Sequence, residues 1–204
     1  MDQIVDLDEA KQAAKDAYDY IWENAKAYGR DAKVYLHWTA GYYDTVFDDY
    51  NFCITKDGAI HYTCPLTETV SSTYMRNSGS VSIALCAAVG ATCEVDSDGN
   101  WSWDLGECPP TEEQIYAMSA LVDVICGALD LTIDNDRVMT HGEAADNEDG
   151  LNPGYEPYAV WSDPQPSDGE TRWDLAVLSN DDEWRSGGDT IRGNAVYIRE
   201  HPSE

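Results

Sequence analysis

The segment from Pro109 to Leu129 constrains the fold more than any other part of the sequence. Two prolines are followed by Thr111, and Gln114 stands three residues later, which is the pattern of a capping box at the start of a helix. The residues that follow place apolar side chains at steps of three and four: Ile115, Met118, Val122, Ile125 and Leu129. This spacing predicts an amphipathic helix with one core-facing stripe.

Strands are predicted for several short segments rich in apolar and aromatic side chains. They are residues 33–38, 50–55, 60–62 and 81–86, and a short strand in "DRVMTH" that ends at a histidine. Alternation in 81–86 places the small side chains on one face and the large ones on the other: Ser82, Ala84 and Cys86 against Val81, Ile83 and Leu85. Such a segment fits a sheet that is covered differently on its two faces.

A second helix is predicted for residues 8–28, with Asp8 as its N-cap and Gly29 as its stop. Strands and helices are therefore mixed without strict alternation. The expected fold class is α/β in the broad, mixed sense: one sheet with helices packed on it. The 204 residues fit one domain that can bury a sizeable core.

Residues 94–104, "EVDSDGNWSWD", predict a β-hairpin with its turn at Asp98-Gly99. The acidic and amide side chains in this segment also suggest a calcium-binding loop. An EF-hand loop counted from Glu94 would need a bidentate glutamate at its twelfth position, and none is present there. The flanking aromatic residues fit strands, so the hairpin is the favoured interpretation.

The excess of acidic side chains excludes some classes of function. The chain has 39 acidic against 12 basic residues, a formal net charge of −27. Nucleic-acid binding is not expected, because phosphate contacts need lysine and arginine. Anionic membrane surfaces are disfavoured for the same reason.

Membrane insertion and export signals are not apparent in the sequence. No run of about 18 apolar residues is present, so no membrane insertion is expected. The N-terminus, "MDQIVDLDEAKQAAKD", has neither the basic start nor the apolar core of a signal peptide. We therefore expect synthesis in the cytoplasm.

The six cysteines form no CxxC pair, so a tetracysteine zinc site is not expected. Cys86 and Cys126 stand in apolar patterns typical of buried thiols. Cys93 and Cys108 flank the predicted hairpin and could pair in an oxidising compartment.

Two of the four histidines, His37 in "LHWTAG" and His141 in "MTHGE", end predicted strands. A strand end beside a loop exposes side chains to a cleft, and a catalytic zinc ion needs three histidine or carboxylate ligands and one open position. A lone strand-end histidine is more often a packed polar residue than a metal ligand. From spacing alone, a metal site stays one of two interpretations, and the 39 acidic residues offer no means of choosing a third ligand. The stretch of about 30 residues after His141, rich in Gly, Pro, Asp and Asn, predicts either a functional loop or disorder.

Six segments, taken in order, resemble one family. They are "HWTAG" at 37–41, "DYNFCITKDG" at 49–58, "NSGSVSIALCA" at 77–87, "TEEQIYAMSALV" at 111–122, "MTHGEAAD" at 139–146 and "TRWDLAVL" at 171–178. The chain resembles the zinc-dependent N-acetylmuramoyl-L-alanine amidases (amidase type 2), whose fold is shared by peptidoglycan recognition proteins and phage lysozyme-amidases. The last two segments, and "GGDTIRGNAVY" at 187–197, are most similar to a branch found in phages and prophages.

This resemblance implies a single central mixed β-sheet flanked by helices, with a zinc site in a cleft at the strand ends. Residues 1–30 are expected to form an N-terminal helix that packs on the domain. Residues 31–180 would form the catalytic domain, and residues 181–204 a C-terminal extension of the same domain.

The resemblance also implies the metal ligands. The first two ligand motifs of the family fall on His37 and His141. The third falls on Asp174, two residues after a basic residue, which here is Arg172 where lysine is common in the family. Asp163, in "SDPQP", is a rival because many relatives carry Asp-Pro-Gly there.

Further site residues follow from the same resemblance. Arg172 is expected to stabilise the reacting group. A helper glutamate of one branch falls on Ala84 and is absent, while the helper tyrosine of the other branch falls on Tyr50. Alternation with Phe52 and Ile54 would make Tyr50 a core residue, but the resemblance favours a catalytic role for it. Glu143 is a candidate for orienting a ligand.

Aromatic and hydroxyl side chains after His37 are candidates for contacting substrate. They are Trp38, Thr39, Tyr42 and Tyr43, and Trp161 further along the chain.

The implied function is hydrolysis of the amide bond between N-acetylmuramic acid and L-alanine of the peptidoglycan stem peptide. Zinc would be the cofactor, peptidoglycan the partner and the bacterial cell wall the place of action, with a monomeric protein. One alternative is a peptidoglycan-binding module of the same fold that does not cut. Another is a structural component of a phage particle with a vestigial site.

Overall fold

The computed structural model describes residues 2–151 and 172–202 and contains a six-stranded mixed sheet. The strand order is β1-β4-β3-β5-β2-β8. The strands are β1 (Gln3–Val5), β2 (Lys33–Trp38), β3 (Phe52–Ile54), β4 (Ile60–Tyr62), β5 (Ser80–Leu85) and β8 (Val138–Thr140). Strands β3, β5, β2 and β8 are parallel neighbours, and β4 and β1 continue the sheet with antiparallel pairing. The expected mixed α/β fold is confirmed.

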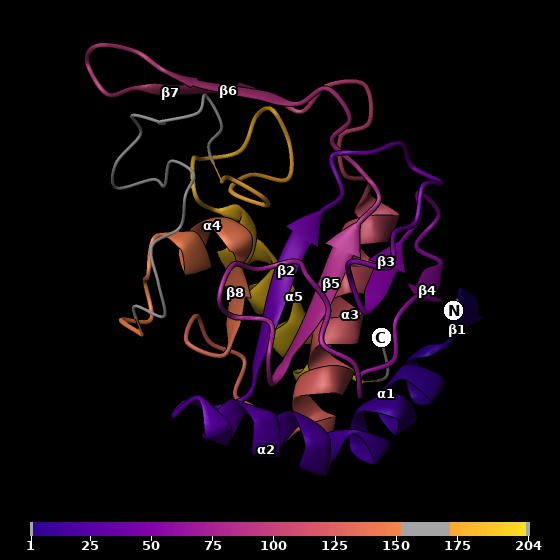
Figure 1. Ribbon diagram of the computed structural model, residues 1–204. Coiled ribbons are helices and arrows are strands. Elements are labelled where there is room, and N and C mark those ends of the chain that lie inside the picture. The colour runs from indigo at the N-terminus through magenta and orange to yellow at the C-terminus, as the bar shows by residue number, and fades with distance from the viewer. Residues whose placement is uncertain (1, 152–171, 203–204) are drawn as a thin grey trace.

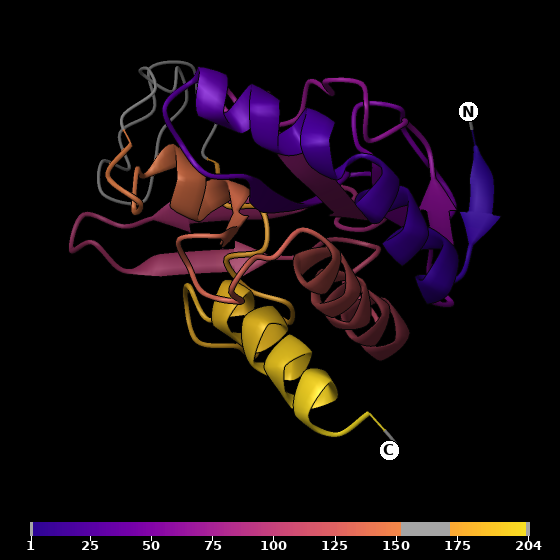
Figure 2. The same cartoon turned by 90° about the horizontal axis from the view of Figure 1, so that it is seen from below.

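Five helices surround the sheet in the described part of the chain. They are α1 (Leu7–Asp16), α2 (Tyr18–Ala27), α3 (Glu112–Ala128), α4 (His141–Ala145) and α5 (Gly187–Glu200). Figure 1 shows α3 and α5 behind the sheet and α1 and α2 along its lower edge. From below, α3 lies between α1 and α5, and it contacts both (Figure 2). None of these helices is long and apolar enough to cross a membrane.

Helix α3 follows the predicted capping box and stripe. The Thr111 hydroxyl accepts the backbone N–H of Gln114, and the Gln114 side chain accepts the backbone N–H of Thr111, both at 3.1 Å. The amide of Gln114 is also buried and donates to the carbonyl oxygens of Ile54 and Cys86, at the ends of β3 and β5. The same side chain therefore caps the helix and fixes it to the sheet.

The predicted N-terminal helix is divided in two at Ala17, which ends α1 and precedes α2. Its N-cap is Asp6 and not Asp8, because Asp6 and Glu9 have the spacing of three that satisfies two free backbone N–H groups. Asp8 lies in the first turn instead. Gly29 follows α2 with φ of +70°, as expected for the stop.

The two faces of the sheet differ in character. Large apolar side chains of β2 and β5, such as Leu36 and Ile83, face the helices and belong to the main core. The opposite face carries Tyr35 and His37 from β2 and Ala84 from β5. The predicted division of residues 81–86 into a face with large side chains and a face with small ones is confirmed. The face with small side chains, called the small face below, leaves room for a site.

The predicted hairpin is present as β6 (Thr92–Val95) and β7 (Trp101–Asp104). Gly99 turns the chain with φ of +85°, and Oδ1 of Asp96 accepts the backbone N–H groups of Asp98 and Asn100. Asp96 thus stabilises the turn. The hairpin lies beyond the carboxyl ends of β2 and β5, across the top of the sheet in Figure 1.

All six cysteines are free thiols, so the possible Cys93–Cys108 disulfide is not formed. The chain after Leu178 includes α5. Ile191 and Ala195 of α5 are fully buried, and Arg199 makes an ion pair of 2.6 Å with Asp123 of α3.

Candidate metal centre

Two histidines and one aspartate from distant parts of the chain meet on the small face of the sheet. His37 lies near the end of β2, and His141 is the first residue of α4, directly after β8. Nδ1 of His37 lies 3.3 Å from Oδ2 of Asp174, and Nδ1 of His141 lies 3.4 Å from the same oxygen. Within residues 2–151 and 172–202, this is the group whose ligand atoms could hold a metal, and they all lie within 4.8 Å of one another.

These distances fit a zinc ion. With metal–ligand bonds of about 2.0 to 2.1 Å, neighbouring ligand atoms of a tetrahedral site are roughly 3.3 Å apart. The two histidine–aspartate distances, 3.3 and 3.4 Å, have this value. Two imidazoles and one carboxylate are also a ligand set that leaves a fourth position open, as a catalytic site requires.

The second nitrogen of His37 is held by Thr73, a residue that the sequence did not single out. The Thr73 side chain is buried, and its hydroxyl lies 3.2 Å from Nε2 of His37. When Nε2–H donates to this hydroxyl, Nδ1 keeps the lone pair that a metal requires. Thr73 is fixed in turn, because its backbone N–H donates to Oδ1 of Asn77 at 2.7 Å.

Burial and mutual attraction set the protonation of the ligands. Burial lowers the pKa of His37 to about 4, although Asp174, which would accept a hydrogen bond from the protonated ring, opposes the change. Burial by itself would raise the pKa of Asp174, but His141 and His37 outweigh it and lower that pKa below its usual range. At neutral pH the site therefore presents a neutral imidazole and an ionised carboxylate, the forms that bind divalent cations.

A tight turn presents Asp174 to the histidines. The backbone N–H of Ala176 donates to the carbonyl oxygen of Trp173 at 2.9 Å, and Leu175 has φ of +58°. Non-glycine residues in this left-handed region are strained and concentrate at functional sites. Helix α5 begins directly on the turn, where a Cβ at Gly187 would overlap the carbonyl oxygen of Leu175. Glycine at this position is therefore required for the helix to approach.

The family of the chain follows from a comparison with known protein families. Residues 12–155, more than half of the chain, match the family described as N-acetylmuramoyl-L-alanine amidase. This chain belongs to that amidase family. The matched region contains His37, Tyr50 and His141 and ends before Asp174. Asp174 therefore owes its assignment to the resemblance of "RWD" and to the distances above.

A comparison with solved structures finds a partial likeness. The Ph2119 endolysin from Thermus scotoductus MAT2119 bacteriophage Ph2119 is 19% identical, over 54% of this chain and 71% of that chain, with a TM-score of 0.39. No curated protein matches this chain. The identification as an amidase consequently depends on the family match.

Tyr50 lies beside the first histidine of this amidase. The two rings are tilted against each other, with centroids 5.3 Å apart. Strand β3 begins at Phe52, so Tyr50 precedes it, and the Tyr50 ring packs on the small face beside Cys53. Burial, and then the charge of Asp174, raise the pKa of the Tyr50 hydroxyl, which therefore stays protonated.

Arg172 is half-buried two residues before Asp174. Its positive charge contributes a small lowering of the pKa at both His37 and Tyr50, where burial has the larger effect. The position where one branch of the family carries glutamate is Ala84, which pairs with His37 across β2 and β5. A helper carboxylate is thus absent at that position.

Glu143 acts on the backbone around His141. One of its oxygens accepts the backbone N–H of Thr140 at 2.7 Å, and Thr140 is the N-cap of α4. Both oxygens also receive the guanidinium of Arg192, at 2.9 and 2.8 Å. The pair is buried, and a Cβ at Gly188 would lie 2.7 Å from Oε1 of Glu143. Glu143 thereby connects α5 to the start of α4.

The candidate substrate contacts separate into two groups. Trp38 is 5% exposed and lies on the core face of the sheet, edge-on against Trp173, so the structure does not bring it to the site. Thr39 is half-buried in the turn after β2, and Tyr42 is 56% exposed. Tyr43 donates its hydroxyl to the carbonyl oxygen of Pro109.

Trp161 and the rival ligand Asp163 lie outside the described residues.

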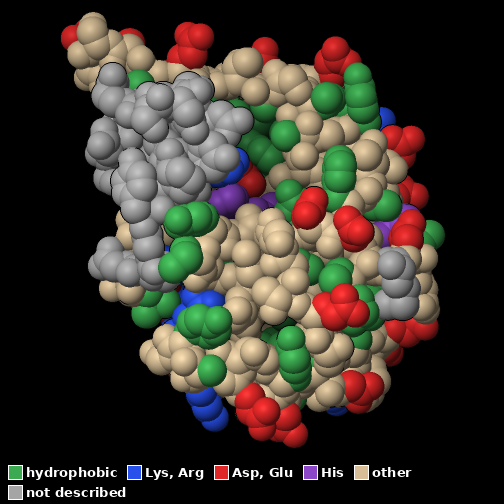
Figure 3. Space-filling model, viewed as in Figure 1, with side chains coloured by type: hydrophobic (Ala, Val, Ile, Leu, Met, Phe, Trp, Pro, Cys, Tyr) green, Lys and Arg blue, Asp and Glu red, His purple; other side chains and the backbone are tan. Residues whose placement is uncertain are grey.

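On the side viewed in Figure 3, histidine side chains are visible at the bottom of a hollow, with an acidic and a basic side chain close by. Of the three ligand side chains, Asp174 is the most accessible to solvent, with 16% exposed against 6% for His141 and 1% for His37.

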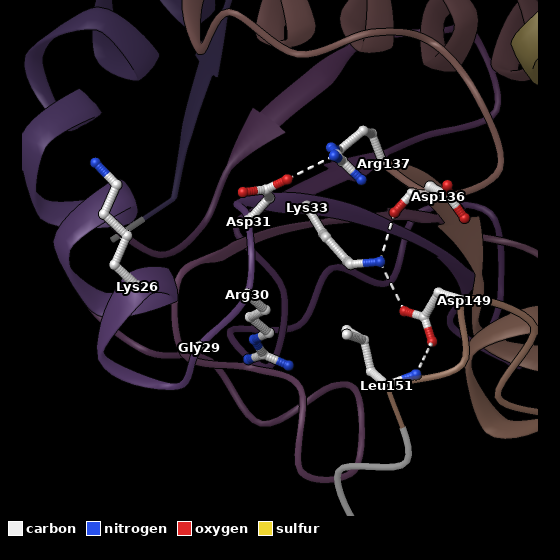
Figure 4. Close-up of a pocket in the computed structure, with 9 residues that line it drawn as sticks. All are labelled: Lys26, Gly29, Arg30, Asp31, Lys33, Asp136, Arg137, Asp149 and Leu151. Atoms are coloured by element: carbon white, nitrogen blue, oxygen red, sulfur yellow. Dashed lines mark hydrogen bonds and ion pairs between the residues drawn. The ribbon is translucent and has the colours of Figure 1, made fainter.

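A second hollow, of about 430 Å³, lies at the opposite end of β2 (Figure 4). On its floor, Nζ of Lys33 contacts the carboxylate of Asp149 at 2.6 Å. Asp149 also accepts two hydrogen bonds from Arg76, at 2.6 and 3.2 Å. The three side chains are between 2% and 4% exposed. Arg76 belongs to the same segment as Thr73, so this buried triad ties that segment to the chain that follows α4.

Proposed function

We propose that the protein is a zinc-dependent peptidoglycan amidase. It acts as a monomer on the bacterial cell wall and hydrolyses the amide bond between N-acetylmuramic acid and L-alanine of the stem peptide. The observation that carries the proposal is the donor set Nδ1 of His37, Nδ1 of His141 and Oδ2 of Asp174, in which both histidine–aspartate distances match a zinc tetrahedron. Its presence in a chain of the amidase family supports hydrolysis.

Zinc held by this donor set would supply a Lewis acid and lower the pKa of a bound water to about 7, so that a nucleophile is available at neutral pH. The chain contributes the geometry. Thr73 keeps Nδ1 of His37 directed at Asp174, and Glu143 fixes the N-cap before His141. Because these partners are buried, the ligands are held in place before the metal binds.

Tyr50 and Arg172 are proposed to act on the reacting carbonyl group. The amide oxygen gains negative charge as the tetrahedral intermediate forms, and a fixed donor or positive charge at that point lowers the barrier. Tyr50 stays protonated beside His37 and can donate a hydrogen bond. Arg172 supplies positive charge that already acts on both neighbours.

Substrate outside the reacting bond is proposed to contact the turn that follows β2. Tyr42 is the exposed aromatic side chain there, and aromatic rings pack well on sugars. Thr39 accepts the backbone N–H of Gly41 at 3.2 Å, which fixes this turn next to His37.

The proposal is tested by incubating the zinc-loaded protein with purified peptidoglycan. We expect new alanine amino groups in the soluble fraction and no new reducing sugar ends. Reducing ends would identify a glycosidase and contradict the proposal. Zinc binding and wall binding without release of either group would identify a non-catalytic binding module of the same fold.

A further inference from the structure

Five of the seven tryptophans of the chain form a continuous row of ring contacts. Trp38 meets Trp173 edge-on at a centroid distance of 4.7 Å, and Trp173 stacks on Trp184 at 6.3 Å. Trp184 then stacks on Trp101 at 4.7 Å and contacts Trp103 at 5.2 Å. The row therefore runs from β2 through the segment before α5 to the β6–β7 hairpin.

One end of this row lies directly beside the metal ligands in sequence. Trp38 follows His37, and Trp173 precedes Asp174. The two indoles lie on the core side of the sheet, where both are nearly buried at 5% and 8% exposure. Their contact joins the backbone of one ligand to the backbone of another.

The segment that carries Asp174 has no regular helix or strand of its own until α5 begins at Gly187. It is held to the hairpin at two points. At the first, Trp184 packs against both hairpin tryptophans. At the second, Oδ1 of Asn180 accepts the backbone N–H of Leu105, just after β7, at 2.9 Å.

The hairpin depends on the same contacts. Its outward side chains, such as Glu94 and Ser102, are exposed, while Trp101 and Trp103 face inward and are half-buried. A two-stranded hairpin is marginally stable alone, so its inward face needs a partner. In the described part of the chain, Trp184 is the aromatic partner that both hairpin tryptophans contact.

We propose that the β6–β7 hairpin positions the carboxylate of Asp174 through the stacked row Trp101–Trp184–Trp173. Trp184 and Trp173 are positioning residues: through their ring contacts they fix the turn from which Asp174 reaches the histidines. The inference rests on the metal site proposed above.

The test measures the zinc affinity of the metal-free protein by competition with a coloured chelator, at a temperature where circular dichroism shows each variant folded. Trp184→Ala should weaken zinc binding about 10- to 100-fold, the usual effect of removing a group that orients a ligand. Trp101→Ala should weaken it about two- to tenfold, since it removes one aromatic pair of the row. Trp184→Phe keeps a ring in the stack and should restore most of the affinity.

Two controls separate positioning from general loss of stability. Ser102→Ala alters the outward face of the same hairpin and should leave zinc affinity unchanged. Trp22→Phe alters a half-buried tryptophan outside the row, whose indole N–H donates to the carbonyl oxygen of Leu129. This variant should lower the melting temperature without changing zinc affinity. The double variant Trp101→Ala/Trp184→Ala should lose no more affinity than Trp184→Ala alone, because both remove the same connection.

The outcomes distinguish this inference from the proposed function. If the unaltered protein binds zinc and the folded Trp184→Ala and Trp101→Ala variants bind it equally well, the positioning role is wrong and the amidase proposal stands. If the unaltered protein binds no zinc, both proposals are overturned. Additive losses of zinc affinity in the double variant would contradict the inference that Trp101 and Trp184 act through one connected row.

Discussion

The hydroxyl of Thr73 lies 3.2 Å from Nε2 of His37, on the side of the imidazole away from Asp174. This contact decides which nitrogen of His37 is available. With Nε2–H donated to Thr73, the lone pair of Nδ1 points at the position where the other two ligands converge.

Thr73→Val should therefore weaken zinc binding about 10- to 100-fold while the fold is kept, because the methyl group fills the space of the hydroxyl without accepting a hydrogen bond. Thr73→Ser retains the hydroxyl and should restore the affinity. Thr132→Val, at an exposed threonine bonded to Asp134, is the matched control. Chelator competition provides the measurement, and equal affinities for the Val and Ser variants would contradict the role of Thr73.

The three ligands should be individually indispensable. His37→Ala, His141→Ala and Asp174→Ala should each remove most of the metal, since a three-ligand site has no spare donor. Asp163→Ala should leave the zinc content at one per chain. Metal analysis after gel filtration gives the answer directly. An empty site in Asp163→Ala, together with a full one in Asp174→Ala, would transfer the third ligand to Asp163.

Tyr50→Phe and Arg172→Ala should leave the zinc content and the fold unchanged while they lower the rate of peptidoglycan hydrolysis. Loss of one donor to a developing oxyanion costs roughly 100- to 1,000-fold in catalytic rate. Arg172→Lys keeps the positive charge and should retain part of the activity. A Tyr50→Phe enzyme with the unaltered rate would remove Tyr50 from the mechanism and leave the zinc ligands untouched, because the ring that packs beside Cys53 is kept.

Asp149→Asn should destabilise the protein by about 3 to 5 kcal/mol, since it leaves the buried charges of Lys33 and Arg76 without their partner. Asp31→Asn breaks only the more exposed pair with Arg137 and should cost roughly 1 kcal/mol or less. Urea unfolding of both variants measures the difference. Similar urea midpoints for the two variants would show that the buried triad stabilises the protein no more than the exposed Asp31–Arg137 pair.

The same triad predicts a pH dependence of stability. Burial would raise the pKa of Asp149, but hydrogen bonds from Arg76 and Lys33 outweigh it and lower that pKa below the ordinary value of 3.8. A lowered folded-state pKa gives stability that is fully present above 3.8 and is lost as the pH falls through the folded-state value. The destabilisation by Asp149→Asn should therefore be constant near neutral pH and shrink only in strong acid.

Features that depend on neighbours along the chain could be predicted from residue type and spacing. The capping box of Thr111 and Gln114 satisfies free N–H groups three residues apart, so it can be recognised without a structure. The alternation in residues 81–86 assigned both faces of β5, and the six ordered segments indicated the amidase family. The prediction of Asp8 as the N-cap was wrong. Asp6 and Asp8 stand within one turn, and Asp6 is the one with a partner, Glu9, three residues later.

Tertiary structure alone decided which distant side chains act together. Thr73 lies 36 residues from His37, and Asp174 lies 137 residues from it, so no local pattern connects them. The tryptophan row, the buried Asp149 triad and the burial of Trp38 depend equally on where the loops cross the sheet. Residue type and spacing encode helix caps and strand faces because those interactions are short-range in sequence. A metal site is defined by distances of a few ångströms between side chains, and those distances exist only after the whole chain has folded.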